Sequence, residues 1–107
     1  MGTAKEKPRV TQKVGGGDAR RLRDLRGIGP RMLEDFHQLG IGSVRHLKGC
    51  DAQRLYDKMC LLSGQRQDPC VLDTYRCAIE QARDPNLPRE QRDWWYWSRL
   101  RLSARVK

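Results

Sequence analysis

The 107-residue sequence lacks the long apolar segments that membrane insertion and secretion require. No run of about 18 apolar residues is present, and residues 1–17 lack the apolar stretch of a signal peptide. Without a secretory signal, the four cysteines are expected to be reduced, buried thiols and not a disulfide framework. We therefore expect a cytoplasmic protein with no membrane partner.

The sequence also lacks the motifs of common catalytic and cofactor sites. It has no P-loop, no dinucleotide-binding fingerprint and no nucleophile in a recognisable triad or elbow. Neither a Cys-x-x-Cys nor a His-x-x-x-His pair is present, so buried thiols are favoured over a metal site. That alternative site would combine Cys60, Cys70 and Cys77 with His37 or His46. We expect that the protein is not an enzyme and has no cofactor.

Positive charge, in contrast, is abundant. The chain has 22 Lys and Arg against 13 Asp and Glu, a formal net charge of +9, which favours an anionic partner such as nucleic acid. Residues 1–31 hold nine basic against three acidic side chains, residues 32–83 seven of each, and residues 84–107 six against three. Residues 1–17 are polar and end in three glycines, a composition that predicts a flexible basic arm.

Apolar residues recur with helical spacing from residue 18 onward, and cap residues bound each segment. Pro30 suits a first helical position and Gly40 suits a helix end. No segment alternates long enough to predict a strand. We expect an all-α fold, a compact bundle of about five short helices, over residues 18–97, followed by a basic tail at 98–107 that frays from Arg99. The predicted helices cover residues 18–26, 30–39, 43–48, 51–62 and 68–83.

The stretch RGIGPRMLEDF, residues 26–36, joins the first two predicted helices through two glycines. This stretch resembles a helix-hairpin-helix DNA-binding element, which has two apolar helix positions, then Gly-Ile-Gly, and then a second helix. The resemblance implies a SAM-like, tandem helix-hairpin-helix domain with flexible basic termini. The residues that fit its spacing are Leu22, Leu25, Gly27, Ile28, Gly29, Leu33 and Phe36.

The two glycines of this hairpin have a physical purpose. Backbone N–H groups at a helix start bind a phosphate oxygen when no Cβ blocks the approach. Gly27 and Gly29 would leave that room, and Ile28 would anchor the turn between the helices. The alternative is that Gly-Ile-Gly is only a tight turn.

The expected DNA contacts lie at and around the start of the second predicted helix. Pro30 lacks an N–H, so the expected donors are Gly29, Arg31 and Met32. The side chains of Arg26 and Arg31 would add contacts to neighbouring phosphates. Such contacts hold the backbone and do not read bases.

A second candidate turn is LLSGQRQDP, residues 61–69, which contains one glycine instead of two. One interpretation is a degenerate second hairpin, with Gly64 in the turn and with Gln65 and Arg66 beside the phosphate path. The other is a structural turn that completes the fold.

The segment LGIGSV, residues 39–44, repeats Gly-Ile-Gly. Here Gly40 is expected to end one helix and Ser43 to cap the next, so we assign this segment no phosphate-binding role.

Residues 18–97 together resemble a family of small bacterial helix-hairpin-helix proteins named for a pathogenicity locus or for mitomycin resistance. The similarity includes the GIGP hairpin, the LGI-SV-L segment, a helix with the pattern D-x-C-V-L-x-x-x-R-C-A and the tryptophan-rich end. It implies a DNA-binding module and no known reaction.

All three tryptophans lie in DWWYW, residues 93–97. Three interpretations stay open: apolar mass packed on the domain's own helices, stacking on unpaired bases, or an anchor for a protein partner.

The predicted function is non-sequence-specific binding of the DNA backbone, in DNA repair or a related DNA-processing pathway. One alternative is an adaptor whose tryptophan-rich end binds a repair or transcription protein. Another is a binder of single-stranded nucleic acid or RNA. We expect a monomer. In some members of this fold class a monovalent cation lies between the hairpin carbonyls and the phosphate, and the sequence leaves such a cation open.

Overall fold

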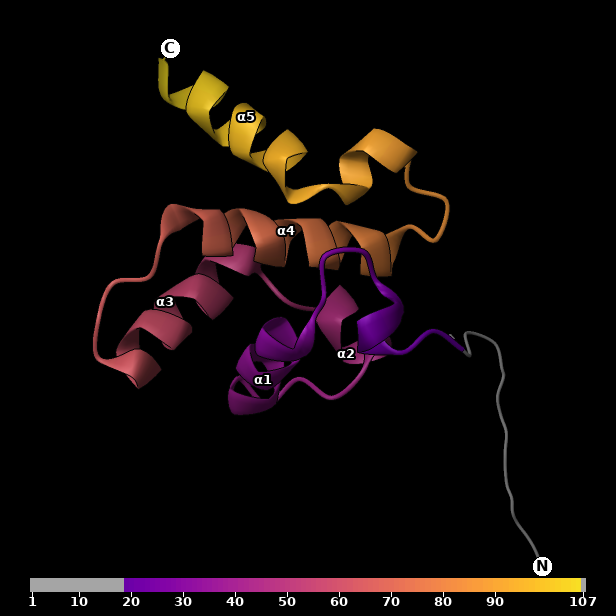
Figure 1. Ribbon diagram of the computed structural model, residues 1–107, viewed down its shortest axis with the longest axis horizontal. Coiled ribbons are helices and arrows are strands. Elements are labelled where there is room, and N and C mark those ends of the chain that lie inside the picture. The colour runs from indigo at the N-terminus through magenta and orange to yellow at the C-terminus, as the bar shows by residue number, and fades with distance from the viewer. Residues whose placement is uncertain (1–18, 107) are drawn as a thin grey trace, which may run out of the picture.

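The computed structural model describes residues 19–106, which form five α-helices and two 3-10 helices with no strand (Figure 1). None of these helices is long and apolar enough to cross a lipid bilayer. The predicted all-α fold is therefore confirmed. In chain order the elements are η2 Leu22–Asp24, α1 Pro30–Gln38, α2 Val44–Lys48, α3 Ala52–Ser63, α4 Pro69–Arg83, η3 Arg89–Arg92 and α5 Trp94–Val106.

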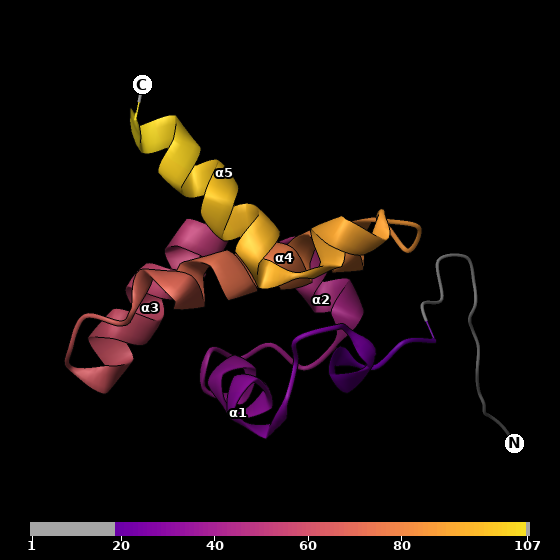
Figure 2. The same cartoon turned by 45° about the horizontal axis from the view of Figure 1, so that its top comes forward.

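Helix α4 forms the centre of the fold. In Figures 1 and 2 it lies between α1, α2 and α3 on one side and α5 on the other, and it contacts α2, α3 and α5. Because it is covered on two sides, its buried residues occupy more than one stripe. They are Leu72, Asp73, Tyr75, Cys77, Ala78, Ile79, Gln81 and Ala82.

The core contains the aromatic pair that joins α1 to α4. Phe36 and Tyr75 are both 0% exposed, and their ring centroids lie 5.7 Å apart. The Tyr75 hydroxyl donates to Asp35 Oδ2 over 3.1 Å. Burial of one such side chain contributes about 1.5–3 kcal/mol, so this contact fixes α1, and with it the preceding turn, against α4.

The local signals for helix starts and ends are largely confirmed. Ser43 Oγ accepts from the His46 N–H (3.0 Å), and Asp51 Oδ1 accepts from the Gln53 N–H (2.9 Å). Gly40 follows α1 with φ +80°, a left-handed conformation that glycine adopts without strain.

The first predicted helix is wrong in its described part. Residues 22–24 form a single 3-10 turn, in which the Asp24 carboxylate accepts from the Arg21 N–H over 2.7 Å. Leu22 and Leu25 are nevertheless both buried, because a spacing of three residues fits a 3-10 turn as well as an α-helix. Asp18 and the arm at 1–17 lie outside the described residues.

The prediction of a fraying tail is also wrong for residues 99–106, which complete α5. The boundary drawn after residue 97 therefore falls inside a helix. Arg101 holds this helix to α4: its Nε and Nη2 donate to Asp73 Oδ1 (2.9 Å) and Oδ2 (3.0 Å). Asp73 is 0% exposed, and a buried carboxylate requires such a partner.

Candidate nucleic-acid interface

The Gly-Ile-Gly turn before α1 is anchored in the core by its central residue. Gly27 has φ +88°, a left-handed conformation that costs a residue with a side chain about 1–2 kcal/mol. Ile28 is 8% exposed and packs in the core beside Leu25, and its N–H donates to the Leu25 carbonyl over 3.2 Å. The turn is therefore held by its central residue, as the sequence predicted.

The start of α1 presents unused backbone donors. Within residues 19–106, no hydrogen bond uses the N–H of Gly29, Arg31 or Met32. The first donor with a partner is the Leu33 N–H, which lies 3.0 Å from the Gly29 carbonyl oxygen. These unused N–H groups lie at the positive end of the helix dipole, where anions bind most favourably.

The cap residues of the neighbouring helices make α1 distinctive. Ser43, Asp51 and Asp68 cap α2, α3 and α4 with side-chain oxygens, whereas Gly29 gives α1 no side-chain cap. A helix start without its own acceptor is available to an external one.

Gly29 also has no role in the fold that a larger residue would disturb. Its φ of −100° and ψ of −171° are ordinary extended values, and a Cβ added to it would meet no atom within 4 Å. Gly27 differs, because its backbone conformation itself favours glycine. The absence of a side chain at Gly29 leaves the approach to the unused N–H groups open.

Arg26 fastens the turn to the rest of the molecule. Its N–H donates to Gln81 Oε1 and its carbonyl accepts from Gln81 Nε2, both over 2.9 Å. Its guanidinium Nε pairs with Asp93 Oδ1, just before α5. The predicted phosphate contact of this side chain therefore competes with a carboxylate that is already bound.

Sequence reasoning did not identify Gln81 or Asp93 as part of this region. Gln81 is 5% exposed and lies between the buried residues Ala78 and Ala82 on α4. A polar residue inside an apolar stripe is the signal that could have marked it, since buried polar groups need partners.

The remaining predicted residues of this turn differ in exposure. Arg31 is exposed and, within the described chain, its side chain makes no hydrogen bond or ion pair. Met32 is half-buried against the core. Arg31 is thus the charged side chain of this turn that is available to a ligand.

Several other arginines bind the protein itself. Arg20 donates to the Gln81 and Ala82 carbonyls (2.8 and 3.1 Å), and Arg83 donates to the Lys48 and Cys50 carbonyls (3.0 Å each). These guanidiniums still contribute positive charge. Their donors, however, already hold helix ends and loops together.

The second candidate turn is held tightly. Gly64 ends α3 with φ +74°, and the Gln65 N–H donates to the Cys60 carbonyl over 3.2 Å. The Tyr56 hydroxyl donates to the Gln67 carbonyl. The structure therefore places Gly64, Gln65 and Arg66 together on one fixed loop.

This second turn differs from the first at the helix that follows it. Asp68 Oδ1 accepts from the Cys70 N–H over 2.8 Å, and hydrogen bonds from Cys70 lower the pKa of the Asp68 carboxyl. The carboxylate occupies the position at the start of α4 that a phosphate would take. Any DNA contact here must therefore come from the loop and not from the helix start.

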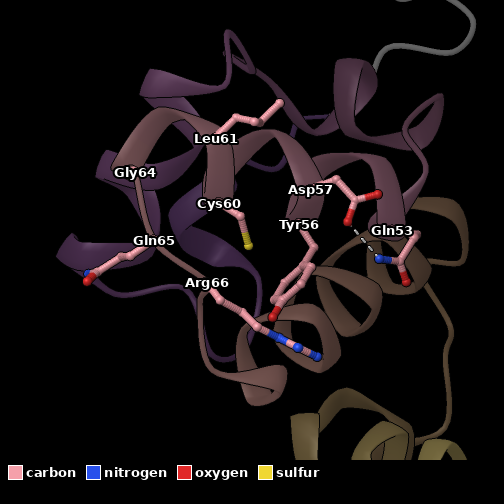
Figure 3. Close-up of a pocket in the computed structure, with 8 residues that line it drawn as sticks. All are labelled: Gln53, Tyr56, Asp57, Cys60, Leu61, Gly64, Gln65 and Arg66. Atoms are coloured by element: carbon pink, nitrogen blue, oxygen red, sulfur yellow. Dashed lines mark hydrogen bonds between the residues drawn. The ribbon is translucent and has the colours of Figure 1, made fainter.

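A shallow depression of about 740 Å³ lies beside this loop (Figure 3). In Figure 3 the Arg66 side chain extends toward the Tyr56 ring, whereas Gln65 points away from it. The two side chains proposed to follow one phosphate path thus diverge. The lining residues are Gln53, Tyr56, Asp57, Cys60, Leu61, Gly64, Gln65 and Arg66.

The two turns are attached to α4 near its opposite ends. The first is fastened at Gln81, and the second leads directly into Pro69. Twelve residues of helix correspond to about 18 Å along the axis. The points at which the two turns join α4 are therefore about 18 Å apart.

Comparison with known proteins shows the family to which the chain belongs. The model of a family described as Pathogenicity locus matches residues 17–102, which include both turns and most of α5. The chain belongs to this family. The mitomycin resistance protein McrB of Streptomyces lavendulae is 37% identical to it over 89 residues, and the alignment covers 81% of each chain. No solved structure gives a significant match. The family predicted from the sequence is thus confirmed.

The four cysteines differ in how deeply their thiols are buried. Cys77 is buried, and burial raises the pKa of its thiol to about 11. The other three thiols are only partly buried, so the prediction of four buried thiols is wrong for them. Within residues 19–106, no group of three or more His, Cys, Asp or Glu side chains is placed to hold a metal ion.

The tryptophan-rich end divides into two parts. Trp97 packs edge-on against Tyr96, with ring centroids 5.1 Å apart, and its indole N–H donates to the Gln91 carbonyl over 2.8 Å. Trp94 and Trp95 stay 37% and 46% exposed. Packing on the protein's own helices therefore accounts for Trp97 and leaves the other two exposed.

Proposed function

We propose that this protein binds the backbone of double-stranded DNA through a helix-hairpin-helix turn, Arg26–Met32, without base specificity. The observation that carries the proposal is the set of unused N–H groups of Gly29, Arg31 and Met32 at the uncapped start of α1. A phosphate oxygen is the ligand that such a helix start favours. The role is that of a binding module in DNA repair or processing, not that of an enzyme.

The rigidity of the turn supports the proposal. Ile28 is buried, Gln81 holds both backbone polar groups of Arg26, and Asp93 pairs with the Arg26 side chain. Donors that are fixed before the ligand arrives lose little conformational entropy on binding. The geometry therefore suits a phosphate that approaches from solvent.

The charge distribution supports a weak, salt-dependent interaction. Arg31 and Arg23 are exposed near the turn, and Arg66 belongs to the second turn, whose helix start is blocked by Asp68. Non-specific binding of this kind has a Kd of about 10⁻⁴ to 10⁻⁶ M at physiological salt. We expect log K to fall linearly with log salt concentration.

The test compares two glycine-to-alanine variants. Gly29→Ala adds a methyl group to the residue whose own N–H is the first of the unused donors, whereas Gly42→Ala changes the matching glycine of the second Gly-Ile-Gly segment. A Cβ at either position meets no atom within 4 Å, so both variants should keep the melting temperature of the wild type.

Binding is measured by fluorescence anisotropy with a labelled, fully paired duplex. Gly29→Ala should weaken binding about tenfold or more, because hydrogen bonds to a charged phosphate contribute about 1.5–3 kcal/mol. Gly42→Ala should bind like the wild type. Equal affinities for all three proteins, or an affinity that does not change with salt, would overturn the proposal and favour the adaptor interpretation.

A further inference from the structure

The exposed indoles of Trp94 and Trp95 suggest a second element of DNA recognition, and this inference rests on the proposed function. We infer that these two side chains form a stacking site for unpaired bases next to the hairpin. The preferred ligand would then be a duplex that adjoins a single-stranded segment, not a fully paired duplex.

Trp94 and Trp95 are the two exposed aromatic residues of the described chain. The chain has seven aromatic residues, and Phe36, Tyr56 and Tyr75 are buried in the core. An exposed indole contributes less hydrophobic free energy to folding than a buried one does. Two of the largest apolar side chains are thus presented to solvent on the first turn of α5.

The arrangement of the rings leaves room for a base. Trp94 and Trp95 meet edge to face, with an interplanar angle of 79° and centroids 6.1 Å apart. In an edge-to-face pair, each ring keeps at least one face that its neighbour does not cover. An unpaired base can therefore stack on an indole without separating the pair.

The pair is fixed beside the proposed phosphate site by an ion pair. Asp93, which contacts Arg26, directly precedes Trp94, so the Cα atoms of Asp93 and Trp94 lie about 3.8 Å apart. Arg26 in turn directly precedes Gly27. The ion pair thus joins the residue before α5 to the residue before the Gly-Ile-Gly turn. A strand held at the hairpin thus passes close to the indoles.

The charge around the pair suits a nucleic-acid strand. Arg89 and Arg99 are exposed, and within the described chain neither makes a hydrogen bond or an ion pair. The nearest acids in sequence are Asp93, which is paired with Arg26, and Glu90, which is exposed. Positive side chains that flank exposed aromatic rings match a strand that offers bases and phosphates together.

Stacking would discriminate between DNA structures. In a paired duplex each base is already stacked on its neighbours, so only unpaired bases are free to occupy an indole face. Stacking of one base on an aromatic side chain contributes about 1–3 kcal/mol, which corresponds to roughly a 5- to 150-fold preference.

The experiment compares a fully paired duplex with the same duplex carrying a short single-stranded tail. Affinities are measured by anisotropy for the wild type, for a Trp94→Ala/Trp95→Ala double variant, and for Leu102→Ala as control. Leu102 is also apolar, lies on α5 and is 49% exposed. The intrinsic tryptophan fluorescence of the unmodified protein is recorded in the same titrations.

The wild type should bind the tailed duplex at least fivefold more tightly than the paired duplex, and the tail should quench its tryptophan fluorescence more strongly. The double variant should lose this preference while its affinity for the paired duplex changes less than twofold. Leu102→Ala should keep the preference. The quenching of the unmodified protein decides the question even if the double variant fails to fold.

Equal binding and equal quenching with both DNAs, or a preference that survives in the double variant, would overturn the inference. The patch would then be assigned to a protein partner. If the proposed function itself is wrong, the result differs. Gly29→Ala and Gly42→Ala would then bind the paired duplex equally well, and this comparison does not depend on the single-stranded tail.

Discussion

Replacement of Gln81 by leucine should loosen the hairpin without opening a cavity, because the two side chains are similar in volume. The amide of Gln81 makes two 2.9 Å hydrogen bonds to the backbone of Arg26. Each contributes about 1 kcal/mol net. Water can reach Arg26, which is exposed, so the penalty for the two lost partners should not exceed this sum greatly.

We therefore expect Gln81→Leu to lower the free energy of unfolding by about 2 kcal/mol, which corresponds to a fall of roughly 8–16 °C in melting temperature for a domain of this size. Urea denaturation followed by circular dichroism measures the loss. Below the new melting temperature the folded variant should also bind paired DNA more weakly, because the donors of the turn are less fixed. A Gln53→Leu variant, altered at an exposed position of α3, is the control. If Gln81→Leu keeps both wild-type stability and wild-type affinity, Gln81 does not hold the hairpin.

Three further predictions concern stability and are checked by urea denaturation. Asp73→Ala should lower the free energy of unfolding by about 3 kcal/mol, because it leaves Arg101 without its buried partner; a loss below about 0.5 kcal/mol, the usual range of surface changes, would contradict this. Gly27→Ala should cost about 1–2 kcal/mol through its positive φ, whereas Gly29→Ala should cost clearly less, and equal costs would refute the distinction. Because burial raises the pKa of the Cys77 thiol to about 11 from 9.0, its contribution is complete below pH 9. The free energy of unfolding should therefore fall by about 2–3 kcal/mol as the pH rises from 9 through about 11. The Cys77→Ala variant should not show this fall.

The elements that sequence reasoning predicted well are those fixed by local interactions. The caps of α2, α3 and α4 are hydrogen bonds between residues two or three positions apart, such as Asp68 with Cys70. Pro30 and Gly40 act through their own backbone conformations. Such signals are complete within a short window, so they can be recognised before any tertiary contact is known.

The features that were missed depend on distant polar partners. Arg26 meets Gln81 and Asp93 across 55 and 67 residues, and Asp73 meets Arg101 across 28. A chain with 22 basic and 13 acidic residues offers many combinations of opposite charge, and composition does not select among them. The length of α5 was missed for this reason, because the ion pair that holds Arg101 is invisible in the local pattern.

The hydrogen-bonding needs of a helix start explain why the first turn, and not the second, is proposed to bind the DNA backbone. The start of every α-helix has N–H groups that favour a negative or polar oxygen. At α4 the chain provides that oxygen itself, through Asp68, whereas at α1 Gly29 provides none. A carboxylate that is already bound must be displaced before a phosphate can enter, and the two anions repel each other. Both turns are therefore attached to α4, while the N–H donors available to a phosphate are those of the first turn.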